Sequence, residues 1–194
     1  AQLAHMIEHD EEPRVKIAAA ETAGAAKLPR AVAPLLKGLK DERNPSEVRA
    51  AFARALGRIG DLKAVDPLLA LARIESGEEE LREAAIEALG DLGDAKAAEF
   101  LTGLFLAQAA EDGPFAAASL EAVLKIAEPG SLALIGRKTQ AELVERIRSD
   151  DDSDTPVTKL LMDRFEEAVD EEEDRAGRVP KSLAAVFALV AHAN

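Results

Sequence analysis

The sequence contains no cysteine, no tryptophan and no tyrosine, and only six of its 194 residues are phenylalanine. Without cysteine the chain has neither a disulfide framework nor a thiolate metal site, which fits a cytoplasmic protein. Runs of β-branched and aromatic residues are also lacking, and no segment alternates apolar with polar residues over a useful length. Because those patterns are typical of strands, we expect an all-α fold.

A long hydrophobic run is missing as well. The longest apolar stretch, Ser182–Ala193, is too short to cross a bilayer, and no signal segment opens the chain. Acids outnumber bases by 37 to 24, which gives a net charge of -13. A surface of this sign repels phosphate and anionic lipid, so we expect neither a nucleic-acid partner nor membrane binding.

What the sequence does contain is an internal repeat. The segment Val48–Asp61 (VRAAFARALGRIGD) returns thirty-three residues later as Leu81–Asp94 (LREAAIEALGDLGD). A weaker copy lies one period earlier at Val15–Leu28, and a looser one follows at Phe115–Glu128. A period in this range is typical of stacked helical repeats, which offer a binding surface more often than a catalytic pocket.

Each repeat is expected to form two helices, an A helix followed by a B helix. In the best copy the A helix should span residues 46–57, with Ser46 capping its first turn and Gly57 and Gly60 ending it. Asp61 should then cap the B helix that follows. The pattern predicts a right-handed α-solenoid of about four to five stacked antiparallel helix pairs.

The array is expected to occupy residues 1–149. Its first ten residues correspond to a B helix without an A helix, which predicts a monomeric fragment of a longer array. Residues 150–194 should form an acidic linker and a degenerate terminal helix pair packed on the array. The predicted units are a partial repeat at 1–13 and repeats at 14–47, 48–80, 81–113 and 114–149.

The pattern R-x-A-x-x-x-A-L-G-x-x-G-D occurs twice and carries a family resemblance. In Arg49–Asp61 and Arg82–Asp94 the arginine, two alanines, leucine, two glycines and aspartate recur in one order. This resembles the short HEAT-like repeats of the phycocyanobilin-lyase type, over roughly residues 1–138. The resemblance implies architecture more than activity, since that family includes lyase subunits, hydroxylases and plain scaffolds. The hydroxylases use His-Glu pairs, and no His-Glu dipeptide occurs here.

One motif matches a metal site in its letters. His5, Glu8 and His9 have the spacing of an H-x-x-E-H zinc motif. No third ligand follows in a recognisable pattern, and two exposed histidines explain the letters equally well. We therefore expect no metal site, no catalytic residue and no cofactor.

A column of cations recurs at the start of the A helices, at Lys16, Arg49 and Arg82. It could be a binding ladder. Such cations more often pair with acids of a neighbouring repeat or with a helix end, so we expect a structural role. Asp61 and Asp94 are likewise expected to be helix caps and not catalytic acids.

The B helices of such an array line its inner, concave surface. Their faces opposite the buried leucines carry cations around small residues, which is a local cationic stripe in an acidic chain. We expect this stripe to hold an acidic or phosphorylated peptide; the alternative is a solvated face of mixed charge. The predicted binding residues are Lys37, Lys40, Asp66, Ala70, Arg73, Glu99, Gly103, Leu106 and Arg137.

The expected function is non-enzymatic. The chain should be a scaffold or adaptor that binds a protein or an acidic peptide on its concave face. A first alternative is an accessory subunit of a lyase-type enzyme that holds a bilin or another cofactor there. A second is a HEAT-type DNA glycosylase, against which the acidity and the missing tryptophan and tyrosine argue.

Overall fold

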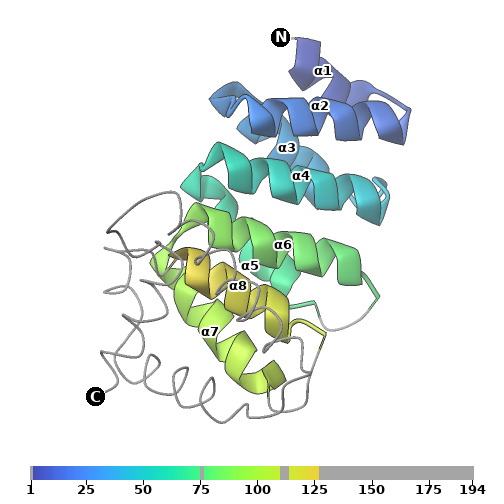
Figure 1. Ribbon diagram of the computed structural model, residues 1–194. Coiled ribbons are helices and arrows are strands. Elements are labelled where there is room, and N and C mark those ends of the chain that lie inside the picture. Colours follow the sequence, from blue (N-terminus) through green and yellow to red (C-terminus); the bar gives the residue numbers. More distant parts are fainter. Residues whose placement is uncertain (1, 75–76, 110–113, 127–194) are drawn as a thin grey trace, which may run out of the picture. The chain divides into compact units, whose positions relative to one another are not determined.

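The computed structural model describes residues 2–74, 77–109 and 114–126. Within these ranges it contains eight α-helices and no strand, so the all-α prediction is confirmed (Figure 1). The chain divides into two compact units, Ala1–Asp94 and Ala95–Asn194. The predicted elements after residue 126, among them the acidic linker and the terminal helix pair, lie outside the described residues.

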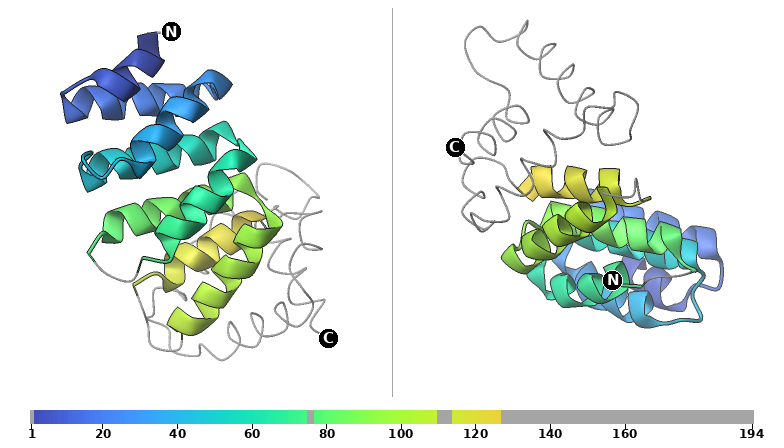
Figure 2. Two further views of the ribbon diagram at one scale, coloured as in Figure 1. Left: turned by 180° about the vertical axis from the view of Figure 1, so that it is seen from behind. Right: turned by 90° about the horizontal axis from the view of Figure 1, so that it is seen from below.

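The first unit contains six α-helices and two short 3₁₀ helices. Three A helices, α2, α4 and α6, lie side by side (Figure 1), and the B helices α1, α3 and α5 follow one another behind them (Figure 2). The order is α1 (Gln2–His9), α2 (Pro13–Ala25), η1 (Pro29–Ala31), α3 (Val32–Lys40), α4 (Ser46–Ile59), η2 (Leu62–Ala64), α5 (Val65–Ala72) and α6 (Glu79–Leu92).

Alanine and leucine at helical spacing explain how these helices pack. Each B helix packs against the A helix that follows it, α1 on α2, α3 on α4 and α5 on α6. Phe52 and Leu56 of α4 and Leu89 of α6 are fully buried, because they lie on the broad apolar face that the sequence repeats. Helix pairing in this unit confirms the predicted stacking, whereas the right-handed superhelix stays a prediction.

The ends of the A helices confirm one predicted role of glycine and correct another. Gly60, with φ 81°, and Gly93, with φ 67°, end α4 and α6 in the left-handed conformation that glycine adopts without strain. Gly57 does not end α4, which continues to Ile59. A Cβ on Gly57 would lie 2.7 Å from the Cα of Ala88, so this glycine allows α4 and α6 to approach closely.

The predicted cap at the start of α4 is wrong. Ser46 is the first helical residue, Pro45 occupies the cap position, and no side chain caps the helix. The buried Ser46 Oγ has no hydrogen-bond partner among the described residues. Asp61, in contrast, does cap: its Oδ1 accepts a hydrogen bond of 3.0 Å from the Lys63 backbone N–H at the start of η2.

The second unit is described at two helices, α7 (Ala95–Ala109) and α8 (Ala116–Ile126), which pack against each other. Phe105 of α7 and Leu120 and Val123 of α8 are fully buried. Two buried hydroxyls, on Thr102 and Ser119, each donate to a carbonyl one turn back, which satisfies them without an outside partner.

Candidate binding surfaces

The cation column has the structural role expected of it. Arg49 is buried. Its Nε donates to the Leu39 carbonyl at 3.0 Å, and its Nη1 donates to the Glu78 carboxylate at 2.8 Å. One period later the Nε of Arg82 donates to the Ala72 carbonyl, also at 3.0 Å. Both carbonyls lie in the last turn of a B helix, where they have no partner within the helix. Each arginine therefore ties its A helix to the end of the preceding B helix.

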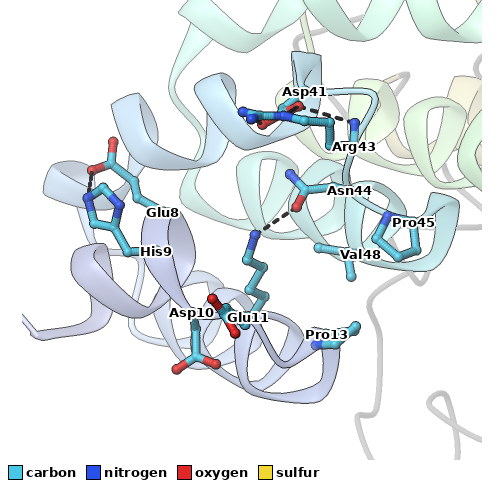
Figure 3. A pocket seen from close by; sticks show the side chains of 11 residues that line it. Glu8, His9, Asp10, Glu11, Pro13, Asp41, Arg43, Asn44, Pro45 and Val48 are labelled. Carbon is cyan, nitrogen blue, oxygen red and sulfur yellow. Dashed lines mark hydrogen bonds and ion pairs between the residues drawn. The ribbon is translucent and has the colours of Figure 1, made fainter.

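Lys16 is linked to the end of a B helix indirectly, through the side chain of Asn44. Its Nζ donates to Asn44 Oδ1 at 2.8 Å (Figure 3). The Asn44 amide in turn donates to the Gly38 carbonyl at 2.8 Å. Asn44 is buried, and this pair of hydrogen bonds links α2 to the end of α3. None of the three cations in the column is free to act as a binding ladder.

These side chains border a pocket of about 430 Å³ between the α1–α2 turn and the α3–α4 loop (Figure 3). Its charged lining is mixed, with the acids Glu8, Asp10, Glu11 and Asp41 facing Lys16 and Arg43. Sequence reasoning missed this corner. The signal was in the segment Asp41–Pro45, whose aspartate, asparagine and proline are typical of a turn.

The loop between α3 and α4 is fixed by one local ion pair. Asp41 accepts hydrogen bonds from the Arg43 backbone N–H at 3.1 Å and from two guanidinium nitrogens at 2.8 and 2.7 Å. The Arg43 side chain, and after it the Arg43 backbone N–H, lowers the pKa of Asp41 from 3.8 to about 2. Asp41 in turn raises the pKa of Arg43. Both groups face solvent, so the pair orders the loop more than it stabilises the fold.

We expect Arg43→Gln to raise the pKa of Asp41 from about 2 towards 3.8, because it removes the leading cause of the shift. Since folding lowers this pKa, the pair contributes stability above the unfolded pKa and loses it as the pH falls through about 2. The measurement is an NMR titration of the Asp41 carboxyl carbon. Lys16→Gln, which removes the smallest contribution to the shift, should move the midpoint far less; a wild-type midpoint near 3.8 would contradict the geometry.

In the first unit, the predicted binding residues lie on exposed faces of the B helices. Lys37 and Lys40 of α3 are exposed, as are Asp66 and Ala70 of α5 and Arg73, which directly follows α5. The Lys37 Nζ lies 3.6 Å from the Glu8 carboxylate of α1, so an acid balances part of its charge. Lys40 has no ion pair or side-chain hydrogen bond with any residue of the described part of the chain.

The remaining predicted residues belong to the second unit. Glu99 and Gly103 of α7 are exposed, and a Cβ on Gly103 would meet no atom within 4 Å. Leu106 lies in α7, and Arg137 lies outside the described residues. The structure thus shows that these residues of α3, α5 and α7, other than Leu106, are exposed, and the binding role itself stays a prediction.

Comparison with known families identifies the repeat. Residues 42–123 match the sequence model for HEAT repeats. These residues are HEAT repeats. They include α4–α6 of the first unit, and all of α7 and most of α8 of the second. The chain matches no curated protein. HEAT repeats are typically surfaces for protein interaction, and the finer resemblance to the phycocyanobilin-lyase type stays a prediction.

The zinc-like motif lies outside the matched HEAT repeats, and its residues contact one another and Lys37. The His5 and His9 rings lie 5.0 Å apart, and Glu8 contacts His9 at 3.4 Å while it also pairs with Lys37. No group of three or more potential metal ligands occurs in residues 2–74, 77–109 and 114–126. Over the same ranges, no helix has the length and apolar character needed to cross a membrane.

Proposed function

We propose that this chain is a non-catalytic interaction scaffold that holds an acidic segment of a protein partner on the exposed face of its B helices. The observation that supports the proposal is the distribution of charge on α3 and α5. The exposed faces carry Lys37 and Lys40 on α3 and the small side chain of Ala70 on α5, and exposed Arg73 directly follows α5, in a chain of net charge -13. Residues 42–123 being HEAT repeats supports a protein partner. The proposed location, the cytoplasm, is a prediction from the sequence.

Small and cationic side chains have separate roles in this proposal. A side chain as short as Ala70 leaves room for a peptide backbone to approach the helix. The lysines and the arginine then supply the complementary charge, which selects an acidic partner and speeds encounter. The acids Glu8 and Asp66 beside them limit the attraction and make it selective for peptides whose carboxylates meet the cations.

We expect Lys37→Glu combined with Arg73→Glu to abolish capture of the partner, because the reversal turns attraction into repulsion. The measurement is quantitative affinity capture from the native cell lysate, followed by direct titration of the acidic segment of each protein that the variant loses. Lys40→Glu and Arg14→Glu form a matched pair, since both cations are exposed and only Lys40 lies on this face. Unchanged capture by the double variant, or equal losses in the matched pair, would refute the proposal.

A further inference from the structure

The turns between the A and B helices of the first unit carry cations that nothing nearby neutralises. They are Lys27 and Arg30 after α2, and Arg58 and Lys63 around the end of α4. All four are exposed, and none has an ion pair or a side-chain hydrogen bond with another described residue. These turns lie on the left in Figure 1, at the end of the A helices away from the pocket of Figure 3. We call the four cations and Leu62 the turn edge.

Acids are few on this edge. The segment from Ala25 to Val32 contains two cations and no acid. In the next turn Asp61 accepts a hydrogen bond from the Lys63 backbone N–H, and Asp66 has an interaction of its own, but both keep their negative charge. Over these two turns four cations therefore stand against two acids, whereas the end of α6 carries Asp91 and Asp94. Elsewhere in the unit, the exposed cations Lys37 and Arg43 have an acid within ion-pair distance, whereas Lys40 and Arg14 stand singly. The turn edge is therefore a locally cationic surface in an acidic chain.

Leu62 adds an apolar contact to the same edge. It is 57% exposed, and it is the large hydrophobic residue that stands out as exposed in the described part of the chain. Its neighbour in the sequence is Lys63, and Pro29 is exposed at the equivalent position of the preceding turn. A single exposed leucine is common, but one beside the unpaired Lys63 favours a ligand with both acidic and apolar groups.

Lys27 occupies a backbone position that glycine would fill more easily. Its φ is +46°, and the two equivalent positions are Gly60 and Gly93, with φ 81° and 67°. A lysine in this conformation has a steric cost that the two glycines do not have. The first repeat therefore has a less favourable backbone conformation at this position, and it has a cation on the turn edge.

We propose that the turn edge binds an acidic peptide in an extended, polyproline-like conformation, with carboxylates three residues apart. Arg30 and Lys63 occupy equivalent positions on adjacent repeats, and packed helices lie about 8–10 Å apart. A polyproline helix rises about 3.1 Å per residue and has three residues per turn, so residues i and i+3 lie about 9 Å apart on one face. Carboxylates at that spacing meet both cations, and an apolar residue next to one of them, on an adjacent face of the polyproline helix, contacts Leu62 beside Lys63.

Charge complementarity favours a peptide over a nucleic acid. A polyanion with a phosphate at every nucleotide would also meet the acids of a chain of net charge -13, which repel it. A peptide can place its few carboxylates only where the cations are. The cations of the turn edge precede or begin the B helices, whereas Lys37 and Arg73 of the proposed function lie towards the ends of the B helices or beyond them. Variants at the two places therefore test the two proposals separately.

The test uses the full chain and a fluorescent twelve-residue peptide made of four Glu-Pro-Leu triplets, followed by fluorescence anisotropy. Arg30→Gln with Lys63→Gln should weaken binding about tenfold, since each exposed ion pair accounts for roughly two- to fivefold in affinity. Lys27→Gly should weaken it about threefold without lowering the urea midpoint, because glycine relieves the positive φ. Raising the salt concentration should weaken binding of the wild type more than of the double variant.

Two controls show whether the peptide binds at the turn edge and through its carboxylates. Arg14→Gln removes an exposed cation away from the turn edge and should leave the affinity unchanged. The matching Gln-Pro-Leu peptide should bind at least tenfold more weakly. The proposal is overturned if the double variant binds like the wild type, if Lys37→Glu with Arg73→Glu weakens this peptide as much, or if a twelve-residue oligothymidine binds more tightly.

Discussion

Replacing Arg49 with methionine is expected to lower the free energy of unfolding by about 2–3 kcal/mol, because hydrogen bonds of a buried charged group are worth this much. Methionine keeps the unbranched aliphatic part of the side chain and removes the guanidinium group, so the loss reports the polar contacts more than packing. The Leu39 carbonyl loses the donor at 3.0 Å, and Glu78 loses its partner at 2.8 Å. Urea denaturation followed by circular dichroism measures the change.

Two further variants make this expectation specific. Arg58→Met removes an exposed cation of the same helix and should change stability by no more than about 0.5 kcal/mol. Arg49→Lys keeps the charge but cannot reach a carbonyl and a carboxylate in one planar fork, so it should recover only part of the loss. Equal stability of Arg49→Met and Arg58→Met would show that the arginine does not tie the repeats together.

The role of this arginine could be predicted from the sequence, as could its kind of partner, an acid or a helix end, but the particular acceptors could not. Recurrence of Lys16, Arg49 and Arg82 at one position indicated a contact repeated in each unit. The acceptors are backbone carbonyls of Leu39 and Ala72, and a carbonyl has no sequence signature. Which carbonyl is left without a partner depends on where each B helix ends, and helix ends are the least predictable part of an element.

The candidate surfaces, too, could be predicted from the sequence only in part. Exposure of Lys37 and Lys40 followed from the periodicity of the leucines beside them, because one face of an amphipathic helix must be buried. The pairing of Lys37 with Glu8 did not, since it joins two B helices whose packing the sequence does not specify. The turn edge was visible only as an aligned column of Arg30 and Lys63. Its lack of acidic partners is a property of the fold.

The glycine column shows how one sequence pattern can arise from two different physical causes. Gly57 near the end of an A helix suggested helix termination, which is the commonest reason for glycine there, and Gly24 is its equivalent one period earlier. In the structure both lie inside their helices, against the next A helix. A missing Cβ can serve either backbone freedom or close packing, and the sequence alone does not distinguish them.

Gly57→Ala is accordingly expected to destabilise the protein by about 1–3 kcal/mol, the usual cost of overpacking, although alanine is the better helix former. The added Cβ would lie 2.7 Å from the Ala88 Cα and 2.9 Å from its Cβ. Because the nearest atom belongs to the backbone, α4 and α6 must separate to admit it. Urea denaturation measures the loss, and adding Ala88→Gly should not restore stability, since the contact with Cα remains.

Two other glycines give the expectation a graded control. At Gly24 the added Cβ would lie 3.0 Å from the Ala55 Cα, a looser contact, so Gly24→Ala should cost less than Gly57→Ala. At Gly103 it would meet nothing within 4 Å, and there alanine should stabilise α7 by about 0.5–1 kcal/mol. If close approach governs this column, the three substitutions fall in that order. If helix termination governed it instead, Gly24→Ala and Gly57→Ala would cost the same.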